Sequence, residues 1–317
     1  MAINSIPQLD LGEFKSGDAV RKGNFVRQLG QAYEGIGFVA IKNHGLSDEI
    51  SEELYEQVKL FFALPDEVKK KYEIAGLAGQ RGYTSFGKEH AKDHNAGDLK
   101  EFWQFGQNVE NDAVRKSTYP KNVSVAELPS FNPLAMRIYK SLEEAGTHML
   151  RAIAIYLGLD EFYFDDKIHN GNSILRAIHY PPITQDPGDA VRSAEHEDIN
   201  LITLLMGASA EGLQVLNRDG EWVDVTALPE HLVVNVGDML QRLTNNKLKS
   251  TTHRVVNPPQ EKWAQPRFSI PFFLHPIGEM DLSCLPECIN EENPKQFDDI
   301  TADEYLNQRL TEIGLKA

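Results

Sequence analysis

Six short segments in the second half of the chain constrain its fold most strongly. Each is rich in β-branched or aromatic residues, and turn-forming pairs such as Pro181-Pro182 and Asp219-Gly220 separate them. We expect strands at 174–180, 196–206, 212–216, 232–236, 251–256 and 268–274. Many short strands joined by tight turns favour a sandwich or a barrel, and a double-sheet jelly roll is one natural solution.

The first half of the chain has the pattern of helices. Residues 20–33 carry apolar side chains at helical spacing, and a short buried strand is expected at 38–41. Residues 79–106 show no clear period and are expected to form a long loop. Further helices are expected from Ser47 towards Phe62, from Pro65, from Leu134 to Leu157 and from Ala302 to Ile313. Because no linker divides the chain, we expect one domain over residues 1–317, with a helical layer packed on a β core.

Composition narrows the kinds of partner. The chain has 317 residues and a formal net charge of −15, which disfavours binding to nucleic acid or to a membrane surface. No signal peptide is visible, and no apolar run approaches the ~20 residues that cross a bilayer. The only cysteines are Cys284 and Cys288, too few for a four-cysteine zinc site. We expect a cytoplasmic protein with a small-molecule partner, and the oligomeric state is not predictable.

The segment AEHEDINLITLL carries the first candidate metal ligands. If it is a strand, His196 and Asp198 project from one face, because side chains alternate along a strand, and Glu197 points away. His253 lies on a different expected strand and can supply a third ligand. Two histidines and one carboxylate on one face of an octahedron leave three positions open, which is typical of non-haem Fe(II) oxygenases.

A basic residue opens the apolar segment that follows. In QPRFSIPFFL, strand alternation places Arg267 and Ser269 on one face and Phe268 on the other. A buried arginine is rare unless it is paired. We expect Arg267, with the hydroxyl of Ser269 beside it, to bind the carboxylate of a small dicarboxylic acid. An ion pair within the fold is the alternative for Arg267.

Several segments resemble, in sequence order, one known family. HEDINLITLL, EGLQVLNRDGEWVDV, HLVVNVGDMLQRLTNNKLKSTTHRVVNPP and RFSIPFFLHP resemble the core of the isopenicillin N synthase-like family of iron(II)/2-oxoglutarate-dependent dioxygenases. IPQLDLG, GFVAIKNHGL and FFALPDEVKKKY resemble its N-terminal region. The resemblance implies an α+β protein. Its core at 170–280 would be a distorted jelly roll (a cupin-like double-stranded β-helix), and residues 1–125 would form a mainly helical region.

The resemblance also implies roles for single residues. It makes His196, Asp198 and His253 iron ligands, and it assigns Arg267, Ser269 and Tyr180 to the cosubstrate 2-oxoglutarate. Ile178 and His179 replace the Asn and first Tyr of the family's frequent N-Y-Y-P pattern. That replacement leaves the hydrogen bonding around the cosubstrate, and the role of His179, open.

The implied activity is the oxidation of an unactivated C–H bond of a small molecule, by hydroxylation or desaturation. The implied cofactor is Fe(II), with 2-oxoglutarate and O₂ as cosubstrates and succinate and CO₂ as products. No side-chain nucleophile or general base is required. The side chains expected to contact the substrate, with ordinary packing as the alternative, are Arg81, Tyr83, Phe86, Phe102 and Phe105. The substrate itself is not predictable.

Three other functions are compatible with part of this pattern. An iron oxidase of the same fold, such as isopenicillin N synthase itself, keeps the triad and the Arg–Ser pair but does not use 2-oxoglutarate. A zinc hydrolase could use two histidines and a carboxylate, but no H-E-x-x-H arrangement supplies its general base. A non-catalytic small-molecule-binding relative would be expected to lose a metal ligand, and all three are present.

Overall fold

Two β-sheets and a set of helices make up the protein. The computed structural model describes residues 6–77, 79–89, 97–109, 111–207, 211–225 and 230–312. In spatial order, the larger sheet consists of β1 (Gln8–Asp10), β2 (Phe38–Lys42), β10 (Leu232–Val236), β7 (Ile202–Met206), β12 (Arg267–Leu274), β5 (Ile174–Tyr180), β4 (Glu101–Gly106) and β3 (Gly82–Thr84). The smaller sheet consists of β6 (Ser193–His196), β11 (His253–Val255), β8 (Leu213–Leu216) and β9 (Trp222–Asp224). The expected mixture of helices and strands is confirmed.

Most of the helices belong to the N-terminal half and to the chain end. The α-helices are α1 (Leu11–Lys15), α2 (Ala19–Gly35), α3 (Asp48–Phe62), α4 (Asp66–Lys69), α5 (Ala113–Thr118), α6 (Phe131–Tyr156), α7 (Asp165–Ile168), α8 (Asp238–Leu243) and α9 (Ala302–Glu312). Short 3₁₀ turns lie at Lys70–Tyr72, Gln260–Lys262 and Pro286–Cys288. Ser47 caps α3 as expected, because its hydroxyl accepts a hydrogen bond from the backbone N–H of Ile50. In the described part of the chain, none of these helices has the length and apolar character needed to cross a membrane.

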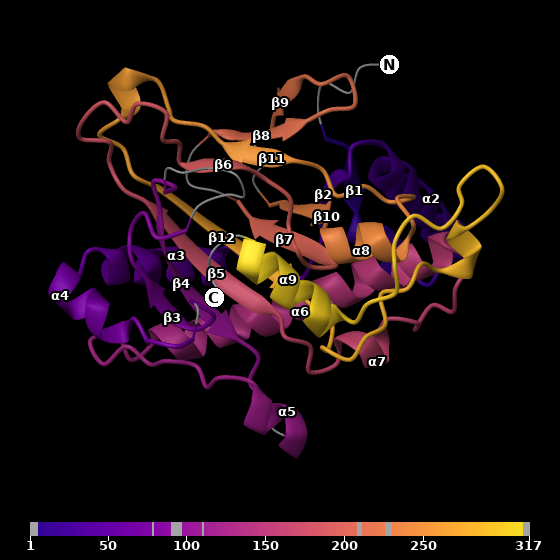
Figure 1. Cartoon of the computed structure of the whole chain (residues 1–317), viewed down its shortest axis with the longest axis horizontal. Helices are drawn as coiled ribbons and strands as arrows, with labels where there is room; N and C mark the ends of the chain where they lie inside the picture. The colour runs from indigo at the N-terminus through magenta and orange to yellow at the C-terminus, as the bar shows by residue number, and fades with distance from the viewer. Residues whose placement is uncertain are drawn as a thin grey trace.

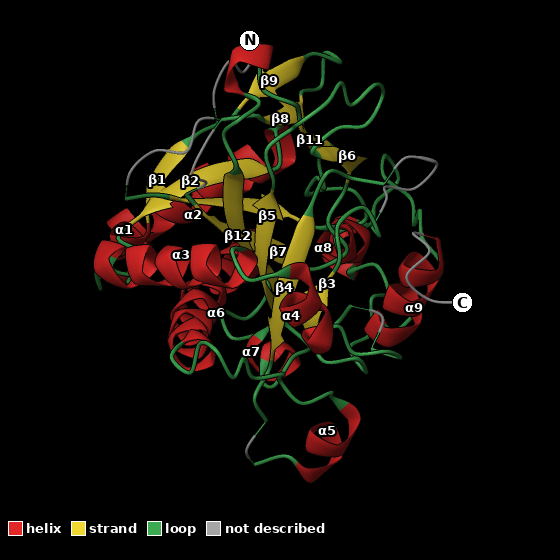
Figure 2. Cartoon of the chain, turned by 90° about the vertical axis from the view of Figure 1, so that its left-hand side faces the viewer, coloured by secondary structure: helices red, strands yellow, loops and turns green. Residues whose placement is uncertain are grey.

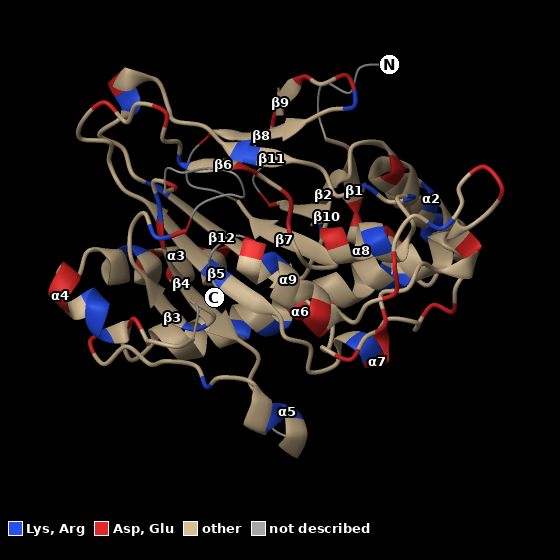
Figure 3. Cartoon of the chain, viewed as in Figure 1, with Lys and Arg blue, Asp and Glu red and all other residues tan. Residues whose placement is uncertain are grey.

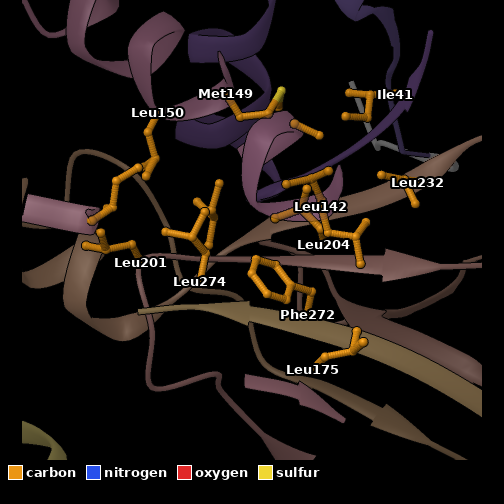
Figure 4. Packing of buried hydrophobic residues seen from close by; sticks show 14 of the residues in the cluster. Ile41, Leu142, Met149, Leu150, Leu175, Leu201, Leu204, Leu232, Phe272 and Leu274 are labelled. Atoms are coloured by element: carbon orange, nitrogen blue, oxygen red, sulfur yellow. The ribbon is translucent and has the colours of Figure 1, made fainter. Parts of the chain in front are cut away.

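The main core lies between α6 and one face of the larger sheet (Figures 2 and 4). Leu142 and Met149 of the helix pack there against Leu204 and Phe272 of the strands, and all four side chains are fully buried. Gly146 permits this close approach, since a Cβ at that position would lie 2.3 Å from Leu274 Cδ1. Burying so much apolar surface is the dominant favourable contribution to folding.

The opposite face of the larger sheet packs on the smaller sheet (Figure 1). Along β5, Leu175 and Ala177 belong to the core under α6, while Ile178 and Tyr180 belong to the cluster between the two sheets. Val215 of β8 is a fully buried member of that cluster from the smaller sheet. The larger sheet is therefore covered on both faces, which explains its nearly continuous apolar strands.

Two expectations about secondary structure were wrong. Residues 79–106 are not simply a long loop, because they contain β3 and β4; residues 90–96 lie outside the described part. Every residue of β4 is buried, so the segment shows no alternation of polar and apolar positions. The expected strand at 196–206 is also interrupted: β6 ends at His196 and β7 begins at Ile202.

Candidate metal centre

His196, Asp198 and His253 meet between the two sheets. β6 and β11 are antiparallel neighbours, and their register sets His253 directly opposite His196. The Oδ1 atom of Asp198 lies 3.9 Å from Nε2 of His196 and 3.7 Å from Nε2 of His253. One potential ligand atom from each of the three residues lies within 4.8 Å of the others. A single ion can therefore contact all three side chains.

The physical reason for this convergence differs from the one expected. Asp198 lies beyond the end of β6, so strand alternation does not place it beside His196. The loop that carries it is instead held by the first residues of α8. The backbone N–H of Asp238 donates to the carbonyl of Asp198 at 2.7 Å, and that of Met239 donates to the carbonyl of Asn200 at 3.1 Å. The carboxylate of Glu197 accepts a hydrogen bond from the hydroxyl of Thr252 at 3.3 Å.

Backbone carbonyls orient both imidazole rings. Nδ1 of His196 lies 2.8 Å from the carbonyl oxygen of Ala194, and Nδ1 of His253 lies 3.1 Å from that of Thr251. In each ring Nδ1 donates its proton, so the lone pair of Nε2 faces Asp198. Burial, together with the nearby His253, lowers the pKa of His196 to about 4, so this ring is neutral at pH 7 and can act as a metal ligand.

The carboxylate of Asp198 is fixed through its other oxygen. Oδ2 accepts hydrogen bonds from the hydroxyl of Thr203 at 2.6 Å and from Nδ2 of Asn235 at 2.8 Å. Burial alone would raise the pKa of Asp198. The two histidines and these hydrogen bonds have a larger effect in the opposite direction, so the pKa of Asp198 is lowered. The residue therefore presents an ionised Oδ1 towards the histidines.

We expect Thr203→Val to weaken metal binding about 10- to 100-fold, the range typical of losing an outer hydrogen-bond partner of a ligand. The variant keeps the shape of the side chain and removes the donor to Asp198. Competition with a fluorescent chelator measures the affinity. Thr147→Val is the control, because the hydroxyl of Thr147 donates to the carbonyl of Glu143 within α6, at 2.8 Å. Equal affinities in both variants would contradict the role given to Thr203.

A cavity of about 260 Å³ extends from the triad between the sheets. Arg267, Ser269 and Tyr180 line it, and Arg267 is only 1% exposed. The guanidinium of Arg267 lies 5.0 Å from the ring of Tyr180, its partner across the β12–β5 pair. Phe268 faces the other side as expected and stacks on His179 with ring centroids 4.7 Å apart. His179 also lies 2.7 Å from the carboxylate of Glu101, on the side of β5 away from the cavity.

The residues present fit iron and a dicarboxylic acid. Two imidazoles and one carboxylate suit Fe(II), and a buried guanidinium beside a hydroxyl suits a carboxylate. A second buried arginine, Arg192, lies 6.0 Å from the ring of Tyr180. Burial and the charge of Arg267 lower the pKa of Arg192 to about 10, which still leaves it cationic at pH 7. Two guanidinium groups, those of Arg267 and Arg192, therefore lie near Tyr180 at this end of the cavity.

The structure does not bring the five expected substrate-contact residues to the cavity, whose described wall contains none of them. Arg81 and Phe105 are buried, Arg81 beneath Gly106 and Phe105 against Phe131. Tyr83 is buried and donates its hydroxyl to Glu101, whereas Phe86 is half exposed at the surface. Phe102 comes nearest, because its ring supports Arg176, which does line the cavity.

Sequence reasoning missed two parts of the cavity wall. One is a buried cluster of charged residues, which consists of Glu89, Asp98, Lys100 and Arg176. Charged residues are usually exposed, and no local pattern marks these four as exceptions. Figure 3 shows how widely charged residues are spread over the helices and loops. The other is α9, which lines the cavity with Leu306, Arg309 and Leu310; Figure 1 shows this helix in front of the larger sheet.

Comparisons with known proteins agree with this geometry. Residues 6–127 match the model of the N-terminal region of non-haem dioxygenases in morphine synthesis, and residues 171–276 match the 2OG-Fe(II) oxygenase superfamily. The 2-oxoglutarate-dependent dioxygenase htyE of Aspergillus rugulosus is 32% identical, over 97% of this chain and 98% of its own.

Solved structures extend the likeness to three dimensions. A 2OG-Fe(II) oxygenase family protein of Caulobacter crescentus is 42% identical with a TM-score of 0.87, over 98% of this chain and 100% of its own. A full-length Neurospora crassa protein in complex with alpha-KG is 31% identical with a TM-score of 0.87, over 98% of this chain and 97% of its own. The chain belongs to the 2OG-Fe(II) oxygenase superfamily. It is an Fe(II)- and 2-oxoglutarate-dependent dioxygenase that uses O₂.

Proposed function

We propose that His196, Asp198 and His253 hold the Fe(II) and that Arg267, Ser269 and Tyr180 hold 2-oxoglutarate. The observation that carries this proposal is that the two groups of side chains line one cavity. When bound, the metal and its cosubstrate supply an oxidant strong enough for an unactivated C–H bond, with succinate and CO₂ as products. We infer that the bond belongs to a small molecule, which is hydroxylated or desaturated.

The protein's own contribution is position and electrostatics. The neutral imidazole of His196 and the ionised Asp198 present lone pairs at fixed places. With 2-oxoglutarate bound, the guanidinium of Arg267 would hold the distal carboxylate, and the hydroxyl of Ser269 would add a hydrogen bond. Asp198, His253 and Arg267 are buried between the two sheets, which strengthens their interactions, whereas His196 is partly exposed. No side chain is required to act as a nucleophile or general base.

One relative suggests a class of substrate. A further structure of the Neurospora crassa protein contains alpha-KG and thymine, and that chain is 30% identical to this one with a TM-score of 0.86. We propose a small, neutral substrate of this kind.

We also propose that the two sheets form a distorted jelly roll within a single domain. The larger sheet, which contains strands from both halves of the chain, supports this proposal. A cytoplasmic location and the absence of nucleic-acid or membrane partners stay predictions.

Anaerobic absorbance tests the cofactor assignment. Addition of Fe(II) and 2-oxoglutarate together is expected to produce a weak visible band, the metal-to-ligand charge transfer of a chelated 2-oxo acid. The band should be absent in His196→Ala and should require much more 2-oxoglutarate in Arg267→Ala. His169→Ala and Arg254→Ala are the controls, because His169 is exposed after α7 and Arg254 lies against Trp222. Iron binding without a band would favour the oxidase that does not use 2-oxoglutarate.

A further inference from the structure

The cavity has a second polar end, at Arg176. On β5, Arg176 and Tyr180 both face the cavity, because side chains alternate and four positions separate them. At about 3.3 Å per residue, the two positions lie ~13 Å apart along the strand. If 2-oxoglutarate is held at the Tyr180 end, as proposed above, the Arg176 end is left for the substrate.

Arg176 is held rigidly at this end. Its guanidinium lies 4.2 Å from the ring of Phe102 and 5.3 Å from the ring of Phe273. Its Nε donates to the side-chain oxygen of Gln104 at 3.3 Å, and its Nη1 donates to both oxygens of Glu89, at 3.1 and 3.2 Å. A guanidinium fixed in this way is preorganised, so little conformational entropy is lost when a ligand binds to it.

The charges around Arg176 balance one another through a chain of ion pairs, which reaches from Arg176 through Glu89 to Lys100, near Tyr180. Lys100 lies 2.8 Å from Glu89 and 2.7 Å from Asp98, so the described part of the cluster contains two cations and two carboxylates. Burial alone would raise the pKa of Glu89. The neighbouring cations Arg176 and Lys100 have a larger effect in the opposite direction and lower this pKa to about 2. A charged group on the substrate would therefore be buried without a compensating charge, which is costly.

The rest of this end is suited to a neutral ligand that both donates and accepts hydrogen bonds. Asn172 lines the cavity, and its Oδ1 atom is buried without a hydrogen-bond partner among the described residues. Ile174, Phe273 and, from α9, Leu306 add an apolar lining. An N–H group directed at Asn172 and a carbonyl directed at Arg176 would satisfy both polar side chains.

We propose that Arg176, with Glu89 and Lys100 balancing its charge, determines substrate specificity. The substrate selected is a small neutral molecule with an amide or imide edge, such as a pyrimidine base, rather than a carboxylate or an amine. This inference rests on the proposed function for the position of the cosubstrate. It adds the residues at the opposite end of the cavity that recognise this substrate and the amide or imide edge that they select.

Calorimetry on the anaerobic protein loaded with Fe(II) and 2-oxoglutarate tests this inference. Thymine is the neutral probe, and orotate, a pyrimidine that carries a carboxylate, is the charged one. Thymine is expected to bind at least about tenfold more tightly than orotate. Arg176→Lys keeps the charge but loses the planar fork, and should weaken thymine binding roughly tenfold or more without changing the 2-oxoglutarate requirement. Arg254→Lys is the matched control, since Arg254 also stacks on an aromatic ring, 3.8 Å from Trp222, and bonds a glutamine, Gln214, at 3.0 Å.

A second variant separates recognition from damage to the fold. Glu89→Gln leaves the cluster with one excess positive charge, so orotate binding should improve relative to thymine by about tenfold, a gain that misfolding cannot produce. The inference is overturned if thymine fails to bind the loaded wild-type protein, if orotate binds it more tightly, or if Glu89→Gln leaves the preference unchanged. Failure of the proposed function is distinguishable, because the 2-oxoglutarate absorption band would then be missing before any probe is added.

Discussion

Asp198→Asn is expected to lower iron affinity and 2-oxoglutarate turnover by more than roughly 100-fold, beyond the range typical of losing an outer partner. The substitution removes the negative charge, and the hydrogen bonds of the site add a second penalty. The Nδ2 group of Asn235 donates to the outer position of this side chain at 2.8 Å, and the hydroxyl of Thr203 donates to it at 2.6 Å. The new amide must therefore place its oxygen outward and its NH₂ group towards the histidines, where it cannot bind a metal.

Chelator competition and succinate formation measure the two effects. Asp224→Asn is the matched control, because Asp224 is exposed on β9 and accepts a hydrogen bond from Gln214 at 3.0 Å. The fold should survive, since the new amide keeps the shape and both hydrogen bonds of the carboxylate. Near-normal iron affinity in Asp198→Asn, with an unchanged thermal transition, would remove Asp198 from the metal site.

The meeting of His196, Asp198 and His253 follows from the sequence only in part. The two histidines face each other because β6 pairs with β11 in an antiparallel register. Local sequence patterns suggest the two strands but do not determine which residues lie opposite each other. The placement of Asp198 depends on contacts with α8, about forty residues further along the chain. Strand alternation predicted that Asp198 lies beside His196, which the structure shows, but the structure does not support that reason for it.

The substrate end of the cavity was less predictable than the fold. Strands and helices with a clear period were expected close to their observed positions, because periodicity reports one buried face. β4 has no such face, and Glu101 and Gln104 within it are buried because Lys69 and Arg176 bond them. A helix at α9 was expected from its own residues, but its place beside the cavity depends on distant contacts such as the hydrogen bond from Tyr305 to Asp238, at 3.3 Å.

Gly237→Ala is expected to damage the metal site although Gly237 is not a ligand. Its φ of −106° and ψ of 171° are open to any residue, so the glycine is required for space and not for backbone freedom. A Cβ there would lie 2.3 Å from both the backbone oxygen and the Oδ1 atom of Asn200. The backbone of the loop that carries Asp198 must therefore shift, which moves the carboxylate away from the two histidines.

The expected cost in stability is about 1–3 kcal/mol, the usual range for overpacking a well-packed site. Iron affinity should fall as well, because the substitution displaces a ligand. Gly23→Ala is the control, since a Cβ on that helical glycine would meet nothing within 4 Å and should stabilise the protein by roughly 0.5–1 kcal/mol. Denaturant unfolding and chelator competition measure the two effects. If Gly237→Ala loses stability and keeps full iron affinity, the start of α8 supports the fold but does not position Asp198.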